Sequence, residues 1–294
     1  MLELSTNDKK QLEGLNISVE QVERQVNQFK TGFPYSDLIA PATIGNGIVK
    51  FSNTEVQELI KQFDEDKQYY DILKFIPASG AASRMFKNIY SFIEEYKGKE
   101  IPEDFLRKEN IKADSIESFF INIRDFAFYD DLKNKMAECD KDINTLLNEN
   151  KLVDIAEFLL ENKGLGYGKL PKALLKFHKY KETSRYALEE HLVEAAQYST
   201  ADAEEGIVAQ LHFTVSQEHL NIFKKVVEEV VPRYEEQFGI RYDISYSVQK
   251  PSTDTVAVDM NNEPFRNNDG SLLFRPGGHG ALIQNLNDLH KEII

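Results

Sequence analysis

The last third of the sequence alternates segments with the pattern of β-strands and segments with the pattern of an α-helix. Residues 207–215 and 242–248 have strand patterns, and residues 217–238 between them have a helical pattern. A helix that connects two strands in this way returns the chain to the same end of the sheet, so the strands become parallel. The alternation therefore predicts an α/β fold with a mostly parallel sheet.

An earlier apolar run, residues 72–78, has the sequence ILKFIPA and ends directly in small residues. Continuous apolar runs are typical of strands that are covered on both faces, so we expect a buried, central strand here. We expect a helical segment over residues 1–70 and an α/β domain over residues 71–294. A charged stretch with helical spacing at about 88–162 is expected to be a helical insertion in that domain.

The charge of the chain limits the class of partner. The 294 residues include 49 acidic and 35 basic side chains, which gives a net charge of -14. Nucleic acids and anionic membrane surfaces need clustered positive charge, so neither is expected as a partner. An anionic ligand would have to be held by a few residues at a local site.

The single cysteine, Cys139, excludes an intrachain disulfide and a cysteine-based zinc site. No apolar window approaches about 18 residues, and the first residues lack the apolar core of an export signal. We therefore expect a cytoplasmic protein that does not cross a membrane.

The first segment that could hold a ligand is PASGAASRMFK, residues 77–87, between the apolar run and a helix. Small residues let backbone amides approach an anion, and the start of a helix adds positive potential. Arg84 and Lys87 supply full positive charges, so phosphate is the expected ligand. The alternative is a tight turn that uses small residues for packing. The small residues assigned to the site are Ala78, Ser79, Gly80, Ala81, Ala82 and Ser83.

Two later segments have similar chemistry. In LPKALLKF, Pro171 restricts the backbone beside Lys172, whose ammonium group suits a phosphate oxygen. In RPGGHG, the pair Gly277 and Gly278 precedes His279, which can donate a hydrogen bond to a phosphate or a base. The alternatives are a lysine that faces water and a glycine-rich turn in which the histidine caps a helix.

Several single residues carry weaker signals. Gln249 ends a strand pattern, where its amide could contact a base, and Ser216 fits a helix N-cap. His212 alternates with apolar neighbours, which favours a buried histidine with satisfied hydrogen bonds. Asp259 could hold a cation, although acidic residues often only form turns. Serine hydrolase, zinc protease and P-loop motifs do not occur, so a P-loop kinase or ATPase is disfavoured.

Taken in order, these segments resemble the nucleotide-sugar pyrophosphorylases, in particular the UDP-glucose and UDP-N-acetylglucosamine group. SGAASRM stands where those enzymes have a glycine-rich loop, LPKALL contains their Pro-Lys pair, FTVS and SVQK match a strand end and a glutamine, and PGGHGAL is nearest to their pattern. PASGAASRMFK and FRPGGHGALIQNLNDL also resemble a bacterial domain-of-unknown-function family related to that superfamily.

The resemblance implies a Rossmann-like sheet with helices on both faces. It also implies a nucleotidyltransferase that makes a nucleotide-sugar and pyrophosphate from a nucleoside triphosphate, with UTP favoured, and a sugar 1-phosphate. Arg84 and Lys87 would neutralise pyrophosphate, and Lys172 would hold the α-phosphate or the sugar phosphate. Gly80 and its small neighbours would receive the base and phosphates, and Gln249, Gly277, Gly278 and His279 would line the nucleotide. Mg²⁺ is implied as cofactor, with Asp259 as its guessed ligand.

The chain departs from the family pattern in three ways. Ser79 and Ala82 replace two glycines of the first loop, and the helical insertion separates that loop from the Pro-Lys pair. An Asn/Asp motif that supports sugar and metal is missing after the last helix, so the resemblance implies a protein that continues past Ile294. The replaced glycines and the missing motif favour the alternative function, a non-catalytic protein that binds a nucleotide or nucleotide-sugar.

Overall fold

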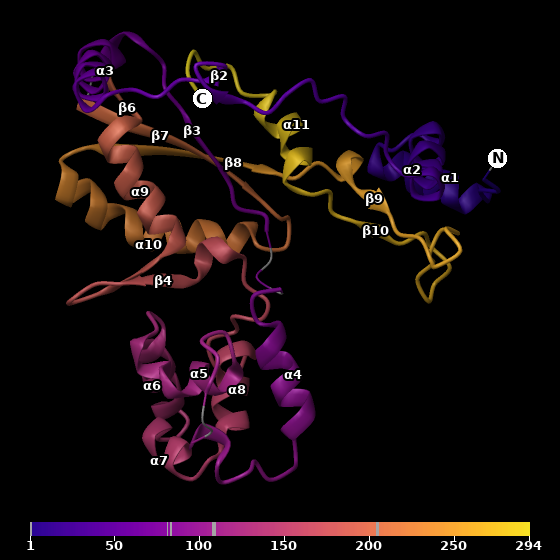
Figure 1. Cartoon of the computed structure of the whole chain (residues 1–294), viewed down its shortest axis with the longest axis vertical. Coiled ribbons are helices and arrows are strands. Elements are labelled where there is room, and N and C mark those ends of the chain that lie inside the picture. Colours follow the sequence, from indigo (N-terminus) through magenta and orange to yellow (C-terminus); the bar gives the residue numbers. More distant parts are fainter. Residues whose placement is uncertain (1, 81, 83, 108–109, 204–205) are drawn as a thin grey trace.

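The computed structural model describes residues 2–80, 82, 84–107, 110–203 and 206–294. Its main sheet contains β3 (Lys74–Pro77), β6 (Thr200–Ala203), β7 (Gly206–Val215) and β8 (Arg241–Val248), as Figure 1 shows. The long strand β7 pairs in parallel with β3 and β8 and antiparallel with β6. The α/β class and the strands near 207–215 and 242–248 are as predicted, whereas the described sheets are small and contain both parallel and antiparallel pairs.

The expectation that the apolar run at 72–78 forms the central strand is wrong, because β7 occupies the centre. Within the described residues, β3 pairs along its length with β7 alone, although Ile72 just before it forms a single bridge with Ile293. Each face of β3 nevertheless makes packing contacts, although Ile76 is the only buried residue of its four. Ile76 packs in the core below the sheet, and the Phe75 ring stacks on the His212 ring at 5.8 Å on the other face.

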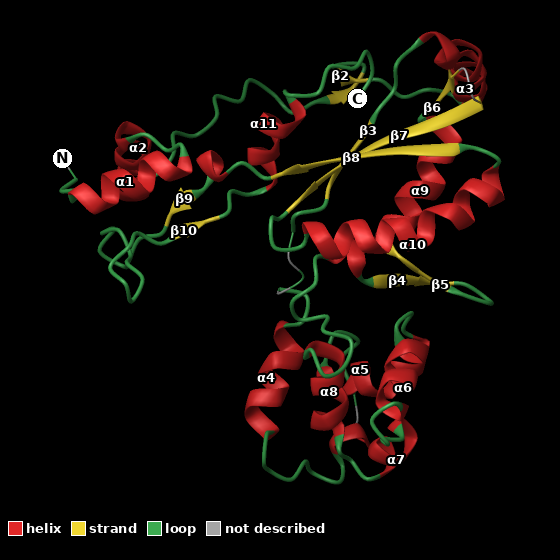
Figure 2. Ribbon diagram, turned by 180° about the vertical axis from the view of Figure 1, so that it is seen from behind, coloured by secondary structure: helices red, strands yellow, loops and turns green. Residues whose placement is uncertain are grey.

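Two long helices, α9 (Ala187–Tyr198) and α10 (Leu220–Phe238), lie on the same face of the sheet (Figures 1 and 2). Alternate residues of β7 point toward them and are fully buried, namely Ala209, Leu211, Phe213 and Val215. The opposite face has polar residues of β7 and β8 and the short helix α11 (Ile283–Leu286).

Helices α4 (Lys87–Tyr96), α5 (Ile116–Ile121), α6 (Tyr129–Ala137), α7 (Ile143–Asn148) and α8 (Leu152–Leu160) surround a core of their own. Aromatic rings form its centre, and Figure 2 shows these helices grouped below the sheet unit. The chain enters this helical bundle through residues 78–86 and leaves it through residues 161–175. Both connections contain a segment that the sequence marks as a ligand loop.

Near the N-terminus, α1 (Thr6–Leu15) and α2 (Val19–Thr31) pack on the antiparallel pair β9 (Thr255–Val256) and β10 (Phe274–Arg275). Asp8 is buried and accepts hydrogen bonds from both terminal nitrogens of Arg266, at 2.7 and 3.0 Å. The first and last parts of the chain are therefore joined by a small core and an ion pair.

The remaining regular elements are short or exposed. β1 (Thr43–Ile44) pairs with β2 (Gly47–Ile48), α3 (Asn53–Asp66) follows, and β4 (Lys176–Lys179) pairs with β5 (Ser184–Tyr186). Single 3-10 turns occur at Lys67–Tyr69, Phe105–Arg107, Ile123–Asp125, Lys172–Leu174, Pro251–Thr253 and His279–Leu282. Across the described ranges, no helix combines the length and the apolar character that a membrane span requires.

Candidate functional site

Hydrogen bonds bring the first loop, residues 77–87, and the third loop, residues 275–280, together where the parallel strands end. The Ala78 amide donates to the Thr214 carbonyl at 2.7 Å, so the first loop begins directly at the sheet edge. The Ser79 hydroxyl then donates to Oε1 of Gln249 at 3.0 Å, and Nε2 of Gln249 donates to the Gly277 carbonyl at 2.8 Å. Gln249, which follows β8, thus connects the two loops through its side chain.

The second loop, residues 170–177, contacts the first loop through its backbone. The Lys172 amide donates to the Gly80 carbonyl at 3.2 Å, although the helical bundle separates these residues in sequence. We call this meeting of residues 78–80, 171–172, 249 and 277–278 the loop junction. It lies at the carboxyl ends of β3 and β8, the edge at which open α/β sheets bind ligands.

His219 is a positioning residue that the sequence analysis missed. Its Nε2 lies 2.7 Å from the Lys169 carbonyl, and its Nδ1 lies 2.5 Å from the Ser216 hydroxyl. The imidazole therefore holds the second loop against the end of β7. The expected N-cap role of Ser216 is wrong, because α10 begins at Leu220 with His219 at the N-cap position. The only sequence signal was a histidine soon after a strand end.

The glycines of the junction differ in whether a side chain would fit at their positions. A Cβ atom on Gly277 would lie 2.5 Å from the Thr253 carbonyl oxygen and 2.8 Å from Cβ of Ala281, so internal packing requires glycine there. A Cβ atom on Gly80 or Gly278 would meet no atom within 4 Å, and neither residue has a left-handed φ. Packing within the described chain therefore explains why Gly277 is glycine, whereas Gly80 and Gly278 are open toward solvent.

The basic side chains of the first and second loops are free to meet an anion. Arg84, Lys87 and Lys172 are exposed, and no carboxylate of the described chain lies within ion-pair distance of them. Lys87 begins α4, and no side chain caps the amides of the first turn of this helix. A helix start with uncapped amides and nearby cations favours a bound anion.

One acidic residue stands beside the junction. Burial raises the pKa of Asp254, and a hydrogen bond from the Gly277 amide opposes part of that rise. The carboxyl group is adjacent to the third loop, so its protonation state affects the charge that a phosphate would meet.

The other residues that the sequence assigns to the ligand site fall into three groups. Ala78 packs in the core of the sheet unit and Ala82 in the core of the helical bundle, so both side chains point away from solvent. His279 is exposed at the start of the His279–Leu282 turn. Ala81 and Ser83 lie outside the described residues.

Asp259 does not fit the guessed metal site. Its Oδ1 accepts the amides of Asn261 and Glu263, at 2.8 and 3.0 Å, in an exposed turn that follows β9. These hydrogen bonds lower the pKa of its carboxyl group and give it the role of a turn former. Elsewhere in the part of the chain that the structure describes, no three His, Cys, Asp or Glu side chains gather as a metal site would require.

The prediction for His212 is confirmed. Its ring is buried, and its two nitrogens each lie 2.8 Å from a serine hydroxyl, those of Ser245 and Ser247. Burial lowers the pKa of His212, so the neutral form is favoured. Asn285 of α11 donates to the Ser247 hydroxyl at 3.0 Å, which places this polar cluster beneath the C-terminal segment.

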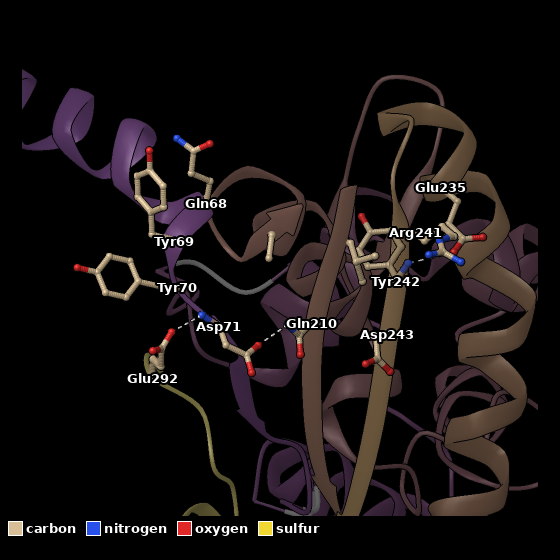
Figure 3. Close-up of a pocket in the computed structure, with 12 residues that line it drawn as sticks. Gln68, Tyr69, Tyr70, Asp71, Gln210, Glu235, Arg241, Tyr242, Asp243 and Glu292 are labelled. Carbon is tan, nitrogen blue, oxygen red and sulfur yellow. Dashed lines mark hydrogen bonds between the residues drawn. The ribbon is translucent and has the colours of Figure 1, made fainter. Parts of the chain in front are cut away.

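A cavity of about 820 Å³ lies at the opposite end of the main sheet (Figure 3). Its walls come from the residues before β3, the starts of β7 and β8, and the C-terminal segment. Asp71 accepts hydrogen bonds there from Lys291 at 2.8 Å and from Gln210 at 2.7 Å, and these bonds lower the pKa of its carboxyl group. No described residue of the three ligand loops reaches this cavity, and Asp71 is paired there with Lys291.

A family model described as Domain of unknown function (DUF4301) matches residues 5–294 of the chain. No curated protein and no solved structure matches the chain.

Proposed function

The chain belongs to this family of unknown function, and we propose that its loop junction binds a nucleoside triphosphate and transfers the nucleotidyl group to a sugar 1-phosphate. The observation that carries the proposal is the hydrogen-bonded chain from Ser79 through Gln249 to Gly277, joined by Lys172 at Gly80. It gathers at one sheet edge the same segments that resemble nucleotide-sugar pyrophosphorylases. In this proposal the parallel strands β3, β7 and β8 form the Rossmann-like part of the fold.

The open glycines favour a ligand over a purely structural turn. Gly80 and Gly278 have free space where a side chain would lie, and a phosphate can use that space to approach the backbone amides. A structural turn would use glycine as Gly277 does, to avoid a clash inside the protein. The two kinds of glycine therefore separate ligand binding from packing within one junction.

The proposed reaction needs no proton transfer. An anionic oxygen of the sugar 1-phosphate attacks the α-phosphorus, a new P–O bond forms, and the bond to the β-phosphate oxygen breaks to release pyrophosphate. Positioning and charge neutralisation account for most of the catalysis in such transfers. Lys172 would hold the α-phosphate or the sugar phosphate, and Arg84 with Lys87 would neutralise the leaving pyrophosphate.

Gln249 has two roles in this proposal. One amide hydrogen and one acceptor position of its side chain are used within the junction, by Gly277 and Ser79. A primary amide has a second hydrogen and a second lone pair, so it can still contact a base. We therefore expect Gln249 to order the loops first and to contribute to base recognition through its remaining capacity.

Magnesium does not have an evident protein site at the junction. Asp254 is the acidic side chain identified there, and one carboxylate whose pKa is raised by burial is a poor ligand set for a hard cation. We derive no step through a protein-bound ion. Mg²⁺ is supplied in the experiment as the complex that it forms with the triphosphate substrate.

The second candidate function is nucleotide binding without transfer. The replacement of two loop glycines by Ser79 and Ala82, together with the burial of Ala82, favours it. Incubation with Mg-UTP or Mg-ATP and a panel of sugar 1-phosphates distinguishes the two. Release of pyrophosphate that depends on the sugar phosphate supports transfer, whereas binding detected by calorimetry without pyrophosphate release supports the binding protein.

The glycines provide a matched set of variants. We expect Gly80→Ala and Gly278→Ala to change the free energy of unfolding by less than about 0.5 kcal/mol, because the added methyl groups enter open space. We expect Gly277→Ala to cost about 1–3 kcal/mol, because its methyl group meets a carbonyl oxygen. Urea unfolding measures stability, and calorimetry with UTP measures affinity. Unchanged affinity in both stable variants would contradict a phosphate site at these glycines.

A further inference from the structure

The segment from Phe29 to Glu65 is exposed along its whole length. It contains β1, β2 and α3, and we call it the exposed arm. It is attached at both ends to folded parts of the chain, through α2 and through the residues before β3. Figures 1 and 2 show it extending over the upper side of the molecule, away from the helical bundle.

The sequence of α3, the helix of the arm, is typical of an amphipathic helix that packs against another surface. Val56, Leu59, Ile60 and Phe63 follow the spacing i, i+3, i+4, i+7 and form one apolar stripe. The stripe residues are 37–50% exposed, and none of the helix is buried. A capping box between Ser52 and Glu55 starts the helix, with hydrogen bonds of 2.7 and 3.3 Å.

Local capping alone does not account for this helix. Isolated helices of about 12–15 residues are marginal in water, and α3 has 14 residues. A stable helix of this length usually depends on burial of its apolar face. The stripe therefore requires a surface to cover it.

The charge of α3 argues against a polyanionic partner. The helix has five acidic residues and one lysine, Lys61, so nucleic acids and anionic membranes would be repelled. The partner must instead offer an apolar surface with the same elongated shape. A second copy of α3 has both properties, and because its net charge is also negative, the apolar stripe must supply the stabilisation of the contact.

The stripe is complementary to itself when two helices pack antiparallel. A two-fold axis between Leu59 and Ile60 places Val56 opposite Phe63 of the second copy and Leu59 opposite Ile60 of the second copy. The smallest side chain then faces the largest, and two isomers of equal size face each other, so successive layers have similar volume. Self-complementary contacts of this kind are the basis of two-fold dimers.

The rest of the arm adds enough area for a stable contact. Its other large apolar side chains include Phe33, Tyr35, Leu38, Ile39, Ile44, Val49 and Phe51, which are 50–101% exposed. With the four stripe residues, these exposed side chains offer on the order of 1,000 Å² per copy, and a standard stable interface buries about 800 Å² per partner, so most of the arm must take part in the contact. We propose that the exposed arm is a homodimer interface in which two α3 helices pack antiparallel, stripe against stripe.

The first test measures the mass of the full chain by light scattering after size exclusion, at about 5–50 μM. We expect a dimer for the wild type and a monomer for Leu59→Asp and Ile60→Asp, because each places a charge in the contact. These residues are exposed within one chain, so the variants should keep their far-UV circular dichroism. Thr54→Asp adds the same charge on the opposite side of the helix and should remain dimeric. A monomeric wild type, or a dimer that survives both variants, would overturn the proposal.

The second test uses the single native cysteine, Cys139, which is exposed. In a Cys139→Ser background, Ile60→Cys places a thiol next to the proposed axis, and Glu58→Cys places one on the polar side. Mild oxidation should produce a covalent dimer from the first variant in high yield and from the second in low yield. A monomeric Ile60→Cys protein overturns the proposal whether its thiol is reactive or protected, since protection would mean that the arm packs on its own chain.

Discussion

Replacement of Arg84 by alanine should lower the affinity of the protein for UTP by roughly 10–100-fold, since a hydrogen bond between charged groups contributes about 1.5–3 kcal/mol. Arg84 is exposed and has no ion-pair partner within the described chain, so the folded protein should lose little stability with it. Calorimetry with UTP and ATP measures the affinity, and thermal unfolding measures the stability. The effect should appear as a loss of binding at an almost unchanged melting temperature.

Arg24→Ala is the matched control for this experiment. Arg24 is an exposed arginine of α2, remote in sequence from the three loops, and its replacement removes the same charge from the protein. It should bind UTP as the wild type does. If Arg84→Ala retains wild-type affinity, or if its binding loss is accompanied by unfolding, the proposed phosphate site at the first loop is wrong.

Replacement of Asp8 by asparagine should lower the free energy of unfolding by about 2 kcal/mol or more. Breaking a buried ion pair typically costs about 3–5 kcal/mol, and we expect less here because the Arg266 side chain is 42% exposed and can be solvated when it loses its partner. The Asp8 carboxylate also accepts the Ser5 amide at 2.8 Å, so α1 loses part of its cap. Urea unfolding at pH 7 measures the effect, and Glu13→Gln on the exposed side of α1 is the control.

The same pair predicts the sign of a pH dependence. The hydrogen bonds from Arg266 hold the pKa of Asp8 well below its usual range. Because the folded state binds this proton less readily than the unfolded state, the contribution of Asp8 is complete above the unfolded pKa of about 3.9. It is lost as the pH falls from there toward the folded pKa. The difference in stability between wild type and Asp8→Asn should therefore shrink from pH 6 to pH 2.5, and a constant difference would contradict this assignment.

Local patterns in the sequence were sufficient for much of the secondary structure. The strands near 207–215 and 242–248 are where alternation placed them, because burial on a sheet imposes a period of two on the residues of each strand. The helix after β7 was predicted three residues too early. It begins at Leu220, directly after His219, whose ring contacts a carbonyl far away in sequence.

The position of each strand in the sheet could not be obtained in this way. Apolar residues 72–78 correctly indicated a strand, yet β3 spans Lys74–Pro77, has Ile76 as its buried residue, and lies beside the central strand β7. Phe75 is covered by the His212 ring, a contact with a residue that lies more than a hundred positions later. A pattern records that a side chain is covered, and it does not record which neighbour covers it.

By itself, the sequence determined that the chain is an acidic α/β protein with small-residue loops that contain basic residues, because composition and local periodicity depend on neighbouring residues alone. The tertiary structure decided that three distant loops meet through Ser79, Gln249, Gly277 and Lys172, and that Ala82 turns into the helical core. It also decided that the apolar stripe of α3, although readable from spacing, remains 37–50% exposed within the described chain. These outcomes depend on long-range packing, where the free energy comes from surfaces that only the complete fold brings into contact.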